Sequence, residues 1–503
     1  MPGYVVAAPA SGSGKTTVAT GLMAAHAGCG RVVAPFKVGP DYIDPGYHGL
    51  AAGRPGRNLD PVLVGPQRIA PLYAHGAAGA DLAVVEGVMG LFDGRVDDHA
   101  PAAVTVAEGS TAHVAGLLGL PVVLVVDARG HSQSMAALVR GFATHDPATR
   151  VAGVVLNRVG GDRHAAILTA ACESVGVPVL GALPRRASVA VPSRHLGLVT
   201  ATEYDDEAAE AVREMRRVVS DSVDLDALEA LAAPAAAGAA WDPVAEVAAA
   251  RAADGATGPR PDEEPVTVAV AGGAAFTFAY PEHTELLAAA GARVVTLDPV
   301  HDTALPPGTE ALVLPGGFPE LHLDALSANT ALRADVARAV AEGMPVHAEC
   351  AGLLYLCRDL TPVSTDPVDT HPAPLPMCGV LPGRGRFTGR LTLGYREAVA
   401  LADSVTHRAG ERVTGHEFHR TVVDTAPATD TAPSTDTAPA TDADPAPAPA
   451  WAWRDWRGAP VREGAVSGGV HASYLHTHPA GHPAGPTRQV DAARARRAAA
   501  GAR

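Results

Sequence analysis

The sequence predicts an α/β protein of two domains, each built on a mostly parallel sheet. A chain of 503 residues is too long for one ordinary hydrophobic core. Short apolar runs alternate with helical stretches in its first half, which is typical of parallel strands covered by helices. The composition then shifts to Ala and Pro over residues 231–264, where we expect a linker, and a second alternating pattern follows.

Composition excludes several functional classes. A net charge of −15 disfavours general binding of nucleic acid or anionic membranes. No apolar run approaches the ~18 residues of a membrane span, and the N-terminus lacks the basic region of a signal peptide. The five cysteines follow no regular spacing, which argues against a disulfide scaffold. We therefore expect a cytoplasmic enzyme with neither nucleic-acid nor membrane partners.

The first domain is expected to span residues 1–230. It opens with a buried strand at Tyr4–Pro9, and a helix is predicted from Lys15 to about Ala25. Further apolar strands are expected at Arg31–Phe36, Asp81–Gly87, Pro121–Ala128 and Val151–Asn157.

The segment between the first strand and the first helix, ASGSGKTT, has the strand–loop–helix context of a phosphate-binding P-loop. Lys15 would reach the β- and γ-phosphates of ATP, and Thr16 would bind Mg²⁺. Pro9 replaces the first glycine of the motif, and a Gly/Ser linker is the alternative. Lys15 and Lys37 are the only lysines of the chain, which favours a phosphate site. The predicted ATP-binding residues are Gly12, Ser13, Gly14, Lys15, Thr16, Thr17, Lys37 and Asn157.

Acidic residues follow the same strands. Glu86 ends an apolar run, so with Thr16 and Asp44 it is a candidate ligand of Mg²⁺. Asp41, Tyr42 and Asp93 lie in Gly- and Pro-punctuated loops and are candidate substrate contacts. The alternative for each aspartate is turn capping. Asn157 could read a purine edge or cap a loop.

The second domain is expected to span residues 265–485, and it carries a candidate nucleophile. Cys350 lies in MPVHAECAGLLYL, where a strand, a sharp turn and a helix would form an elbow. The alternative is a buried structural cysteine. A thiol nucleophile needs a base, and His476 follows an apolar pair in HASYLHTH. Gly317, in the Gly-Gly turn of LPGGFPE, and Ala351 would donate N–H groups to an oxyanion.

Two further segments carry little core material. A hexad-like repeat begins at Asp424, and we expect a disordered insertion over about 424–450. The tail at 486–503 is expected to be a frayed helix.

Several blocks in this order carry a resemblance: SGSGKTT, PFKVGPDYIDPGYH, RNLDP, VVEGVMGLFDG, PGGFPEL, AECAG, GHEFH and ASYLH. The chain resembles the cobyrinic or hydrogenobyrinic acid a,c-diamide synthases of cobalamin biosynthesis over nearly its whole length. The resemblance implies a dethiobiotin-synthetase-like domain followed by a class I glutamine amidotransferase domain. It further implies that MgATP phosphorylates a corrin carboxylate, that Cys350 and His476 release ammonia from glutamine, and that the a and c acetates become amides.

The chain departs from the family's pattern at three positions. Class I amidotransferases usually carry Glu two residues after the histidine, where this chain has His478. The cobyrinate subgroup also lacks that Glu, which leaves open what orients His476. Ala351 stands where a glycine is usual, and Gly273 stands where an Asp is usual.

Four alternatives share part of this sequence pattern. Cobyric acid synthase uses the same two modules, and a nickel-sirohydrochlorin diamide synthase shares the family's motifs. An ATP-binding regulatory module with an inactive amidotransferase domain is the non-enzyme alternative, and a simple glutaminase is the fourth. The expected partners are small molecules (corrinoid, glutamine and ATP), with a homodimer left open.

Overall fold

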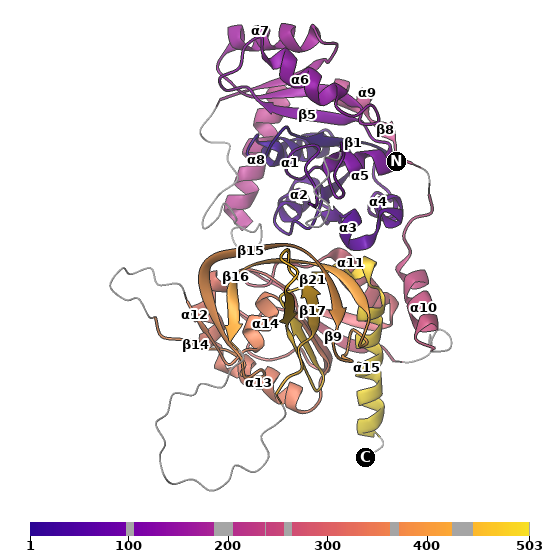
Figure 1. Ribbon diagram of the computed structural model, residues 1–503, viewed down its shortest axis with the longest axis vertical. Helices are drawn as coiled ribbons and strands as arrows, with labels where there is room; N and C mark the ends of the chain where they lie inside the picture. Colours follow the sequence, from indigo (N-terminus) through magenta and orange to yellow (C-terminus); the bar gives the residue numbers. More distant parts are fainter. Residues whose placement is uncertain are drawn as a thin grey trace. The chain divides into compact units, whose positions relative to one another are not determined.

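The computed structural model divides into two compact units, Met1–Asp242 and Pro243–Arg503, which are described separately (Figure 1). The structure describes residues 1–96, 105–185, 205–236, 238–255, 264–362, 372–424 and 446–501. Among these residues, no helix combines the length and the apolarity needed to cross a bilayer.

The first unit is built on a parallel sheet with strand order β3-β2-β4-β1-β5-β6-β7. Each apolar run that was expected to form a strand does so, with bounds that differ by one or two residues. The predicted parallel sheet is confirmed. A short strand, β8, joins β1 in antiparallel pairing. The strands are β1 (Pro2–Ala7), β2 (Val33–Val38), β3 (Arg57–Leu59), β4 (Leu82–Glu86), β5 (Val122–Asp127), β6 (Val151–Val159), β7 (Val179–Pro184) and β8 (Ala233–Pro234).

Helices surround this sheet, and α1 packs against α2 and α8. The contact between α1 and α8 is close because Gly21 has no side chain: a Cβ there would lie 2.8 Å from the carbonyl oxygen of Met215. The helices are α1 (Lys15–Gly28), α2 (Asp44–Ala52), α3 (Pro61–Val64), α4 (Ile69–Gly76), α5 (Thr111–Leu118), α6 (Met135–Thr144), α7 (Asp162–Glu173), α8 (Asp205–Ser222) and α9 (Leu225–Leu231).

The strand order determines which residues meet at the carboxyl edge of this sheet. β1 lies between β4 and β5, and β4 separates it from β2. Lys37 of β2 is in register with Glu86 of β4, and Glu86 is in register with Val6 of β1. Ligands of open parallel sheets bind at this edge, so the P-loop, the lysine and the glutamate share one location.

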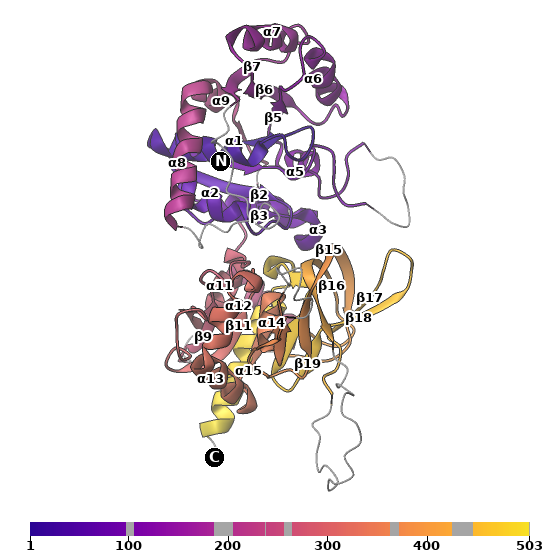
Figure 2. The ribbon, with the colours of Figure 1, turned by 90° about the vertical axis from the view of Figure 1, so that its left-hand side faces the viewer.

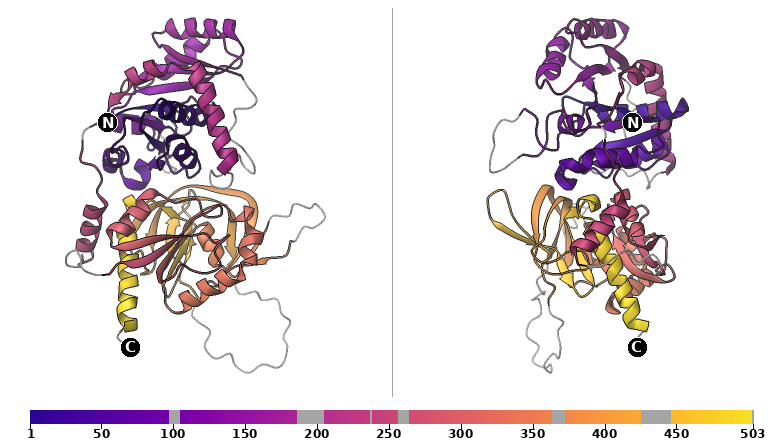
Figure 3. Two further views of the ribbon diagram at one scale, coloured as in Figure 1. Left: turned by 180° about the vertical axis from the view of Figure 1, so that it is seen from behind. Right: turned by 90° about the vertical axis from the view of Figure 1, so that its right-hand side faces the viewer.

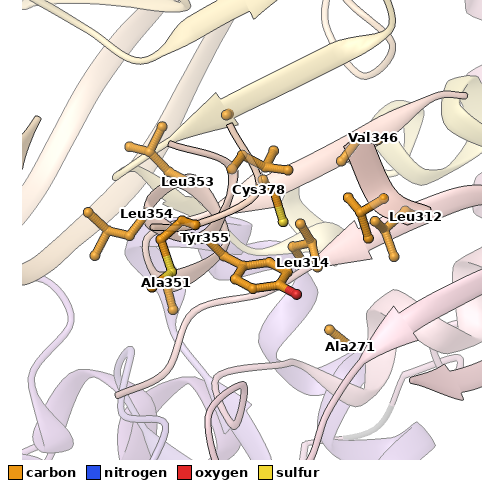
Figure 4. Close-up of a cluster of buried hydrophobic side chains, with 14 of the residues drawn as sticks. Ala271, Leu312, Leu314, Val346, Ala351, Leu353, Leu354, Tyr355 and Cys378 are labelled. Carbon is orange, nitrogen blue, oxygen red and sulfur yellow. The ribbon is translucent and has the colours of Figure 1, made fainter. Parts of the chain in front are cut away.

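The second unit contains a mostly parallel sheet with strand order β10-β9-β11-β12-β20-β19, in which only β19 pairs antiparallel. Helix α14 lies against it, and Figure 4 shows Tyr355 of that helix beside Leu314 of β11. Ala351, Leu353 and Leu354 of α14 and Leu312 of β11 belong to the same buried cluster. The strands of this sheet are β9 (Val266–Ala271), β10 (Ala292–Leu297), β11 (Thr309–Leu314), β12 (Val346–Glu349), β19 (Ala465–Ser467) and β20 (Val470–Ser473).

A second sheet of this unit was not predicted from the sequence. It centres on β15 and β16, two long antiparallel strands (Figure 2). β15 mixes Arg, Thr and Gly with isolated apolar residues over most of its length, so hydrophobic periodicity does not reveal it. The strands are β13 (Asp359–Thr361), β14 (Leu375–Pro376), β15 (Arg384–Ala400), β16 (Arg412–Asp424), β17 (Trp451–Arg454), β18 (Pro460–Glu463) and β21 (His476–Thr477).

The C-terminal tail differs from expectation. Instead of fraying, it forms α15, which packs against β9 and β11 (Figure 3). Gln489 is buried and donates to the carbonyl of Leu312, while Arg488 pairs with Asp254 and Glu411. These contacts dock the tail. The helices are α10 (Pro243–Ala253), α11 (Pro281–Ala289), α12 (Leu323–Ala328), α13 (Thr330–Ala341), α14 (Ala351–Leu356) and α15 (Ala484–Gly501).

The segment at 231–264, expected to be a linker, contains regular structure. Its first part includes β8, and its later part forms α10, which packs against α11 and α15. The expected disordered insertion at 424–450 falls mostly on residues 425–445, which lie outside the described residues.

Candidate active site

The loop between β1 and α1 has the backbone conformation of a phosphate cradle. Gly12 and Gly14 adopt φ of 80° and 90°, a region that residues with a Cβ rarely visit. Asn157, two residues before the end of β6, donates from Nδ2 to the carbonyl of Ser13 at 2.9 Å. A Cβ on Gly14 would lie 2.1 Å from that same nitrogen. The Asn157 amide therefore holds the loop, which differs from the purine contact considered above.

Charged side chains from neighbouring strands converge beside this loop. The Lys37 ammonium donates to Asp44 and, at 3.0 Å, to Oε1 of Glu86. The Thr16 hydroxyl donates to the same Glu86 oxygen at 2.6 Å, and the Lys15 Nζ lies 3.6 Å from it. The structure thus brings together the predicted metal-binding and phosphate-binding residues of the first unit.

Electrostatics within this cluster favour the charged forms of Lys37 and Glu86. Burial opposes ionisation of Glu86, but Lys37, His48 and Lys15 outweigh it and hold the pKa of this carboxyl well below its usual range. Burial, together with Asp41 and Glu86, raises the pKa of Asp44 to about 6. Burial and the neighbouring Lys37 lower the pKa of Lys15. A phosphate entering here would meet ammonium groups that bulk water screens poorly.

The donor set fits Mg²⁺ in character. Two carboxylates, Glu86 and Asp44, lie within hydrogen-bond reach of the Thr16 hydroxyl, at 2.6 and 3.2 Å. Mg²⁺ prefers hard oxygen ligands and usually takes one or two carboxylates together with substrate phosphates. Among the described residues, no group of three or more His, Cys, Asp and Glu side chains could hold a metal ion. The hydroxyl and the nucleotide would therefore have to complete this site.

The three predicted substrate contacts have different surroundings. Asp41 caps the turn before α2, because its carboxylate accepts from the N–H groups of Ile43 and Asp44. Asp93 is exposed, and its carboxylate accepts from the N–H of Gly90. Tyr42 is half-buried next to Asp41. Both aspartates therefore shape loops at this edge, whatever else they contact.

In the second unit, Cys350 forms a sharp elbow between β12 and α14. Its φ of 49° and ψ of −98° lie outside the regions that L-residues favour, and such strain persists only where surrounding contacts enforce it. The Cys350 N–H donates to the carbonyl of Ser473 at 2.7 Å. A Cβ on Gly352 would lie 2.1 Å from the carbonyl oxygen of Leu314. The small residue after the elbow is therefore a steric requirement.

His476 belongs to the same end of the sheet. β12 and β20 are parallel neighbours, with Glu349 in register with Ser473, and His476 follows three residues later. The turn after β11 contacts both groups: the Gly352 N–H donates to Pro315, and a Cβ on Gly316 would lie 2.3 Å from Cε1 of His476. The histidine and the elbow therefore border one turn.

The surroundings of the Cys350 thiol disfavour its ionisation. Burial raises the pKa of Cys350 far above its usual range, and Glu320 raises it further, whereas the N–H of Ala351 lowers it. Only 4% of Cys350 is exposed. A thiol of this kind is protonated at neutral pH, so nucleophilic attack requires a base.

The two predicted oxyanion donors lie near the elbow. Ala351 is the first residue of α14, where helical N–H groups have no partner within the helix. Gly317 follows Gly316 in the turn beside His476, and a Cβ on Gly317 would lie 2.1 Å from the carbonyl oxygen of Ala275. The turn can lie this close to His476 and to Ala275 only because both of its residues are glycines.

Sequence reasoning missed several residues of these sites. His48 is fully buried, and its Nε2 lies 2.7 Å from Oε2 of Glu86. Arg158 donates to the carbonyl of Gly12 in the P-loop. Oε2 of Glu349 lies 3.6 Å from Nδ1 of His476. Of these residues, only Glu349 had a sequence feature that could have pointed to it, because it is an acidic residue directly before the candidate nucleophile.

Two family models match the chain. Residues 4–199 match the CobQ/CobB/MinD/ParA nucleotide binding domain, and residues 267–484 match the CobB/CobQ-like glutamine amidotransferase domain. The two matches fall on the P-loop unit and on the cysteine unit, respectively.

Relatives match over nearly the full length. The hydrogenobyrinate a,c-diamide synthase of Mycobacterium tuberculosis strain H37Rv is 56% identical over 485 residues, covering 96% of each chain. The enzyme of the same name from Streptomyces coelicolor is 52% identical and covers 98% of each chain. A cobyrinate a,c-diamide synthase from Gloeobacter violaceus is 40% identical, covering 94% of this chain and 93% of its own.

A solved structure of PurLQS from Thermotoga maritima covers 45% of this chain and 96% of its own, with 14% identity and a TM-score of 0.30. A likeness that weak carries no argument. The full-length relatives, together with the two matched domains, are sufficient: the chain belongs to the family of hydrogenobyrinate and cobyrinate a,c-diamide synthases.

Proposed function

We propose that this chain uses ATP and glutamine to convert the a and c acetate carboxylates of hydrogenobyrinate into amides. The observation that carries the proposal is identity of 52–56% over 96–98% of the chain to relatives named for this reaction. Cobyrinate is the second candidate substrate, because the relative named for it is 40% identical. The names of these relatives favour an a,c-diamide synthase over cobyric acid synthase and over a regulatory module.

The thiol of the second unit would supply nitrogen. Sγ of Cys350 attacks the carboxamide carbon of glutamine, and His476 takes the thiol proton. The bond between carbon and sulfur forms as the bond between carbon and nitrogen breaks, and the proton leaves with ammonia. Water then hydrolyses the thioester to glutamate and restores the thiol. The N–H groups of Ala351 and Gly317 stabilise the oxyanion in each step.

The P-loop unit would activate the carboxylate. A corrin acetate attacks the γ-phosphorus of ATP, ADP leaves, and an acyl phosphate forms. Ammonia then attacks the acyl carbon, and phosphate leaves. Lys15 and Lys37 face the transferring group and offset its negative charge. Thr16, Glu86 and Asp44 would hold Mg²⁺, which would supply positive charge against the phosphates.

The chemistry of the thiol also favours a reducing compartment. All five cysteines are free, and Cys350 must stay reduced to act as a nucleophile. Reducing conditions of this kind prevail in the cytoplasm, where we place the enzyme.

One incubation tests the proposal. The chain is incubated with MgATP and glutamine in three separate mixtures, each of which contains one tetrapyrrole: cobyrinate, hydrogenobyrinate or nickel-sirohydrochlorin. Mass spectrometry then counts the hydroxyl groups replaced by amino groups. We expect two replacements on hydrogenobyrinate. No replacement on either corrinoid, with two on nickel-sirohydrochlorin, would contradict the proposal.

A further inference from the structure

Glu349 is the last residue of β12 and directly precedes Cys350, yet its carboxylate faces imidazoles. Oε2 lies 3.6 Å from Nδ1 of His476, and Oε1 lies 3.3 Å from Nε2 of His347. The side chain of Glu349 is 11% exposed and that of His476 is fully buried. A contact of 3.6 Å is longer than an ordinary hydrogen bond, but such contacts often tighten when substrate binds.

The carboxylate is held in place from its other side. The backbone N–H and the hydroxyl of Thr477 both donate to Oε1 of Glu349 at 3.1 Å. Thr477 is the residue after His476, so the carboxylate is fixed to the same short strand that carries the histidine. Oε1 is occupied by these bonds, and Oε2 is left to face His476.

The carboxyl group is also ionised. Burial opposes its charge, but the imidazoles of His347 and His476 outweigh burial and hold the pKa of Glu349 well below its usual range. A fixed anion beside one ring nitrogen favours the tautomer in which that nitrogen carries the proton. Nδ1–H then faces Glu349, and the lone pair is left on Nε2.

The position two residues after His476 supplies no carboxylate. It is His478, whose Nδ1 accepts from the N–H of Ala480 at 3.2 Å and whose ring lies 4.0 Å from that of Tyr280. The carboxylate that lies beside His476 therefore comes from β12, on the strand of the nucleophile itself.

We propose that Glu349 is the positioning residue of the thiol site, holding His476 in the orientation and tautomer that take the proton from Cys350. The inference rests on the proposed function, because it assigns a role within glutamine hydrolysis. A carboxylate that orients a catalytic imidazole contributes without touching the substrate. Its loss should therefore slow the chemical step and leave glutamine binding largely intact.

A purely structural role is the rival explanation. Glu349 also borders a cavity of about 20 Å³ whose wall includes His283, His347 and His407, room for about one water. If the carboxylate only satisfied these buried imidazoles, its loss would reduce stability and would affect every activity of the enzyme alike.

The test uses the full chain with Glu349→Gln and Glu349→Asp. Glu310→Gln is the matched control, because the Glu310 carboxylate also accepts a backbone N–H, that of Thr267, at the opposite end of the same sheet. Glutamate release is measured with MgATP and hydrogenobyrinate, giving kcat and KM for glutamine. Amidation with free ammonia and the melting temperature are measured in parallel.

For Glu349→Gln we expect kcat for glutamate release to fall about 100-fold or more, KM for glutamine to stay within about threefold, and the ammonia-dependent rate to stay within about twofold. Glu349→Asp should be intermediate, and Glu310→Gln should match the unaltered enzyme. An unchanged kcat, or an equal loss with ammonia, would overturn the inference.

Two further outcomes are decisive. If Glu349→Gln does not fold, Glu349→Asp decides: a kcat at least about tenfold lower with KM retained supports the inference, and an unaltered kcat overturns it. If the unaltered enzyme releases no glutamate while it amidates with ammonia, the proposed glutaminase function fails, and the inference fails with it.

Discussion

Nε2 of His48 lies 2.7 Å from Oε2 of Glu86, and both side chains are fully buried. The other oxygen of Glu86 is shared by Thr16, Lys37 and Lys15. His48, which extends from α2, therefore fixes the orientation of the carboxylate that is proposed to bind Mg²⁺. Outer partners of this kind set the geometry of metal ligands.

His48→Leu should weaken Mg²⁺ binding. The change replaces the imidazole by an apolar side chain of similar size and so removes the contact with Glu86. We expect the Mg²⁺ concentration for half-maximal ammonia-dependent amidation to rise on the order of 10-fold. His26→Leu is the control, because His26 is also fully buried but lies near the far end of α1 from the P-loop. An unaltered Mg²⁺ dependence in His48→Leu would remove this histidine from the site.

Gly14→Ala should weaken ATP binding. Gly14 has a φ of 90°, and a Cβ would lie 2.1 Å from Nδ2 of Asn157, so the substitution would break the bond from Asn157 to Ser13. We expect the dissociation constant for ATP, measured by calorimetry, to rise by at least about tenfold. The lost hydrogen bond and the strain of an alanine at positive φ together cost more than about 1.4 kcal/mol, which corresponds to a factor of ten.

Gly30→Ala separates the two causes. Gly30 has a φ of 85°, and nothing lies within 4 Å of the Cβ that it would gain. This variant carries the backbone strain without the collision, at the other end of α1. Its ATP affinity should match that of the unaltered enzyme. Equal losses in the two variants would mean that general destabilisation, and not the contact with Asn157, accounts for the effect.

Cys350→Ala should separate the two nitrogen sources. Without the thiol no thioester can form, so we expect the glutamine-dependent rate to fall on the order of 1,000-fold or more. The ammonia-dependent rate should stay within about twofold. Cys357→Ala is the control, because Cys357 is another fully buried cysteine of the same unit. A folded Cys350→Ala enzyme that loses both activities would contradict the scheme.

The sequence predicted the P-loop edge well because its physics is local. Glu86 and Lys37 each stand at or near the end of a short apolar run, and parallel strands bring their carboxyl ends to one edge. His48 follows no such rule, since nothing in the sequence of α2 shows that one of its histidines reaches back to β4. Asn157 lies two residues before the end of β6, and its partner, a backbone carbonyl, carries no sequence signal.

The thiol site was predicted less completely for a related reason. Alternation along a strand places neighbouring residues on opposite faces, so the sequence pattern does not predict that Glu349 and Cys350 both lie near His476. The left-handed φ of Cys350 breaks that alternation. The strands β15 and β16 were not predicted because glycines and charged residues interrupt their apolar pattern, and three consecutive residues of β16, 415–417, are buried together.

Glu463→Gln should stabilise the protein at alkaline pH. Glu463 is buried and accepts from the hydroxyl of Ser473 and the N–H of Tyr474, and burial raises its pKa to about 7. Between about 4.5, the ordinary pKa of Glu, and 7, the folded state binds a proton that the unfolded state has lost. Stability therefore falls as the pH rises through this range.

The cost of the buried charge above pH 7 is at most about 3 kcal/mol. Glutamine carries no charge, so Glu463→Gln should lose less stability than the unaltered enzyme between pH 6 and pH 8. Urea unfolding of the full chain at both pH values measures the difference. Glu310→Gln, which removes a partly exposed carboxylate, controls for the general loss of negative charge. An equal pH dependence in the unaltered enzyme and in Glu463→Gln would show that Glu463 is already ionised, and compensated, at pH 6.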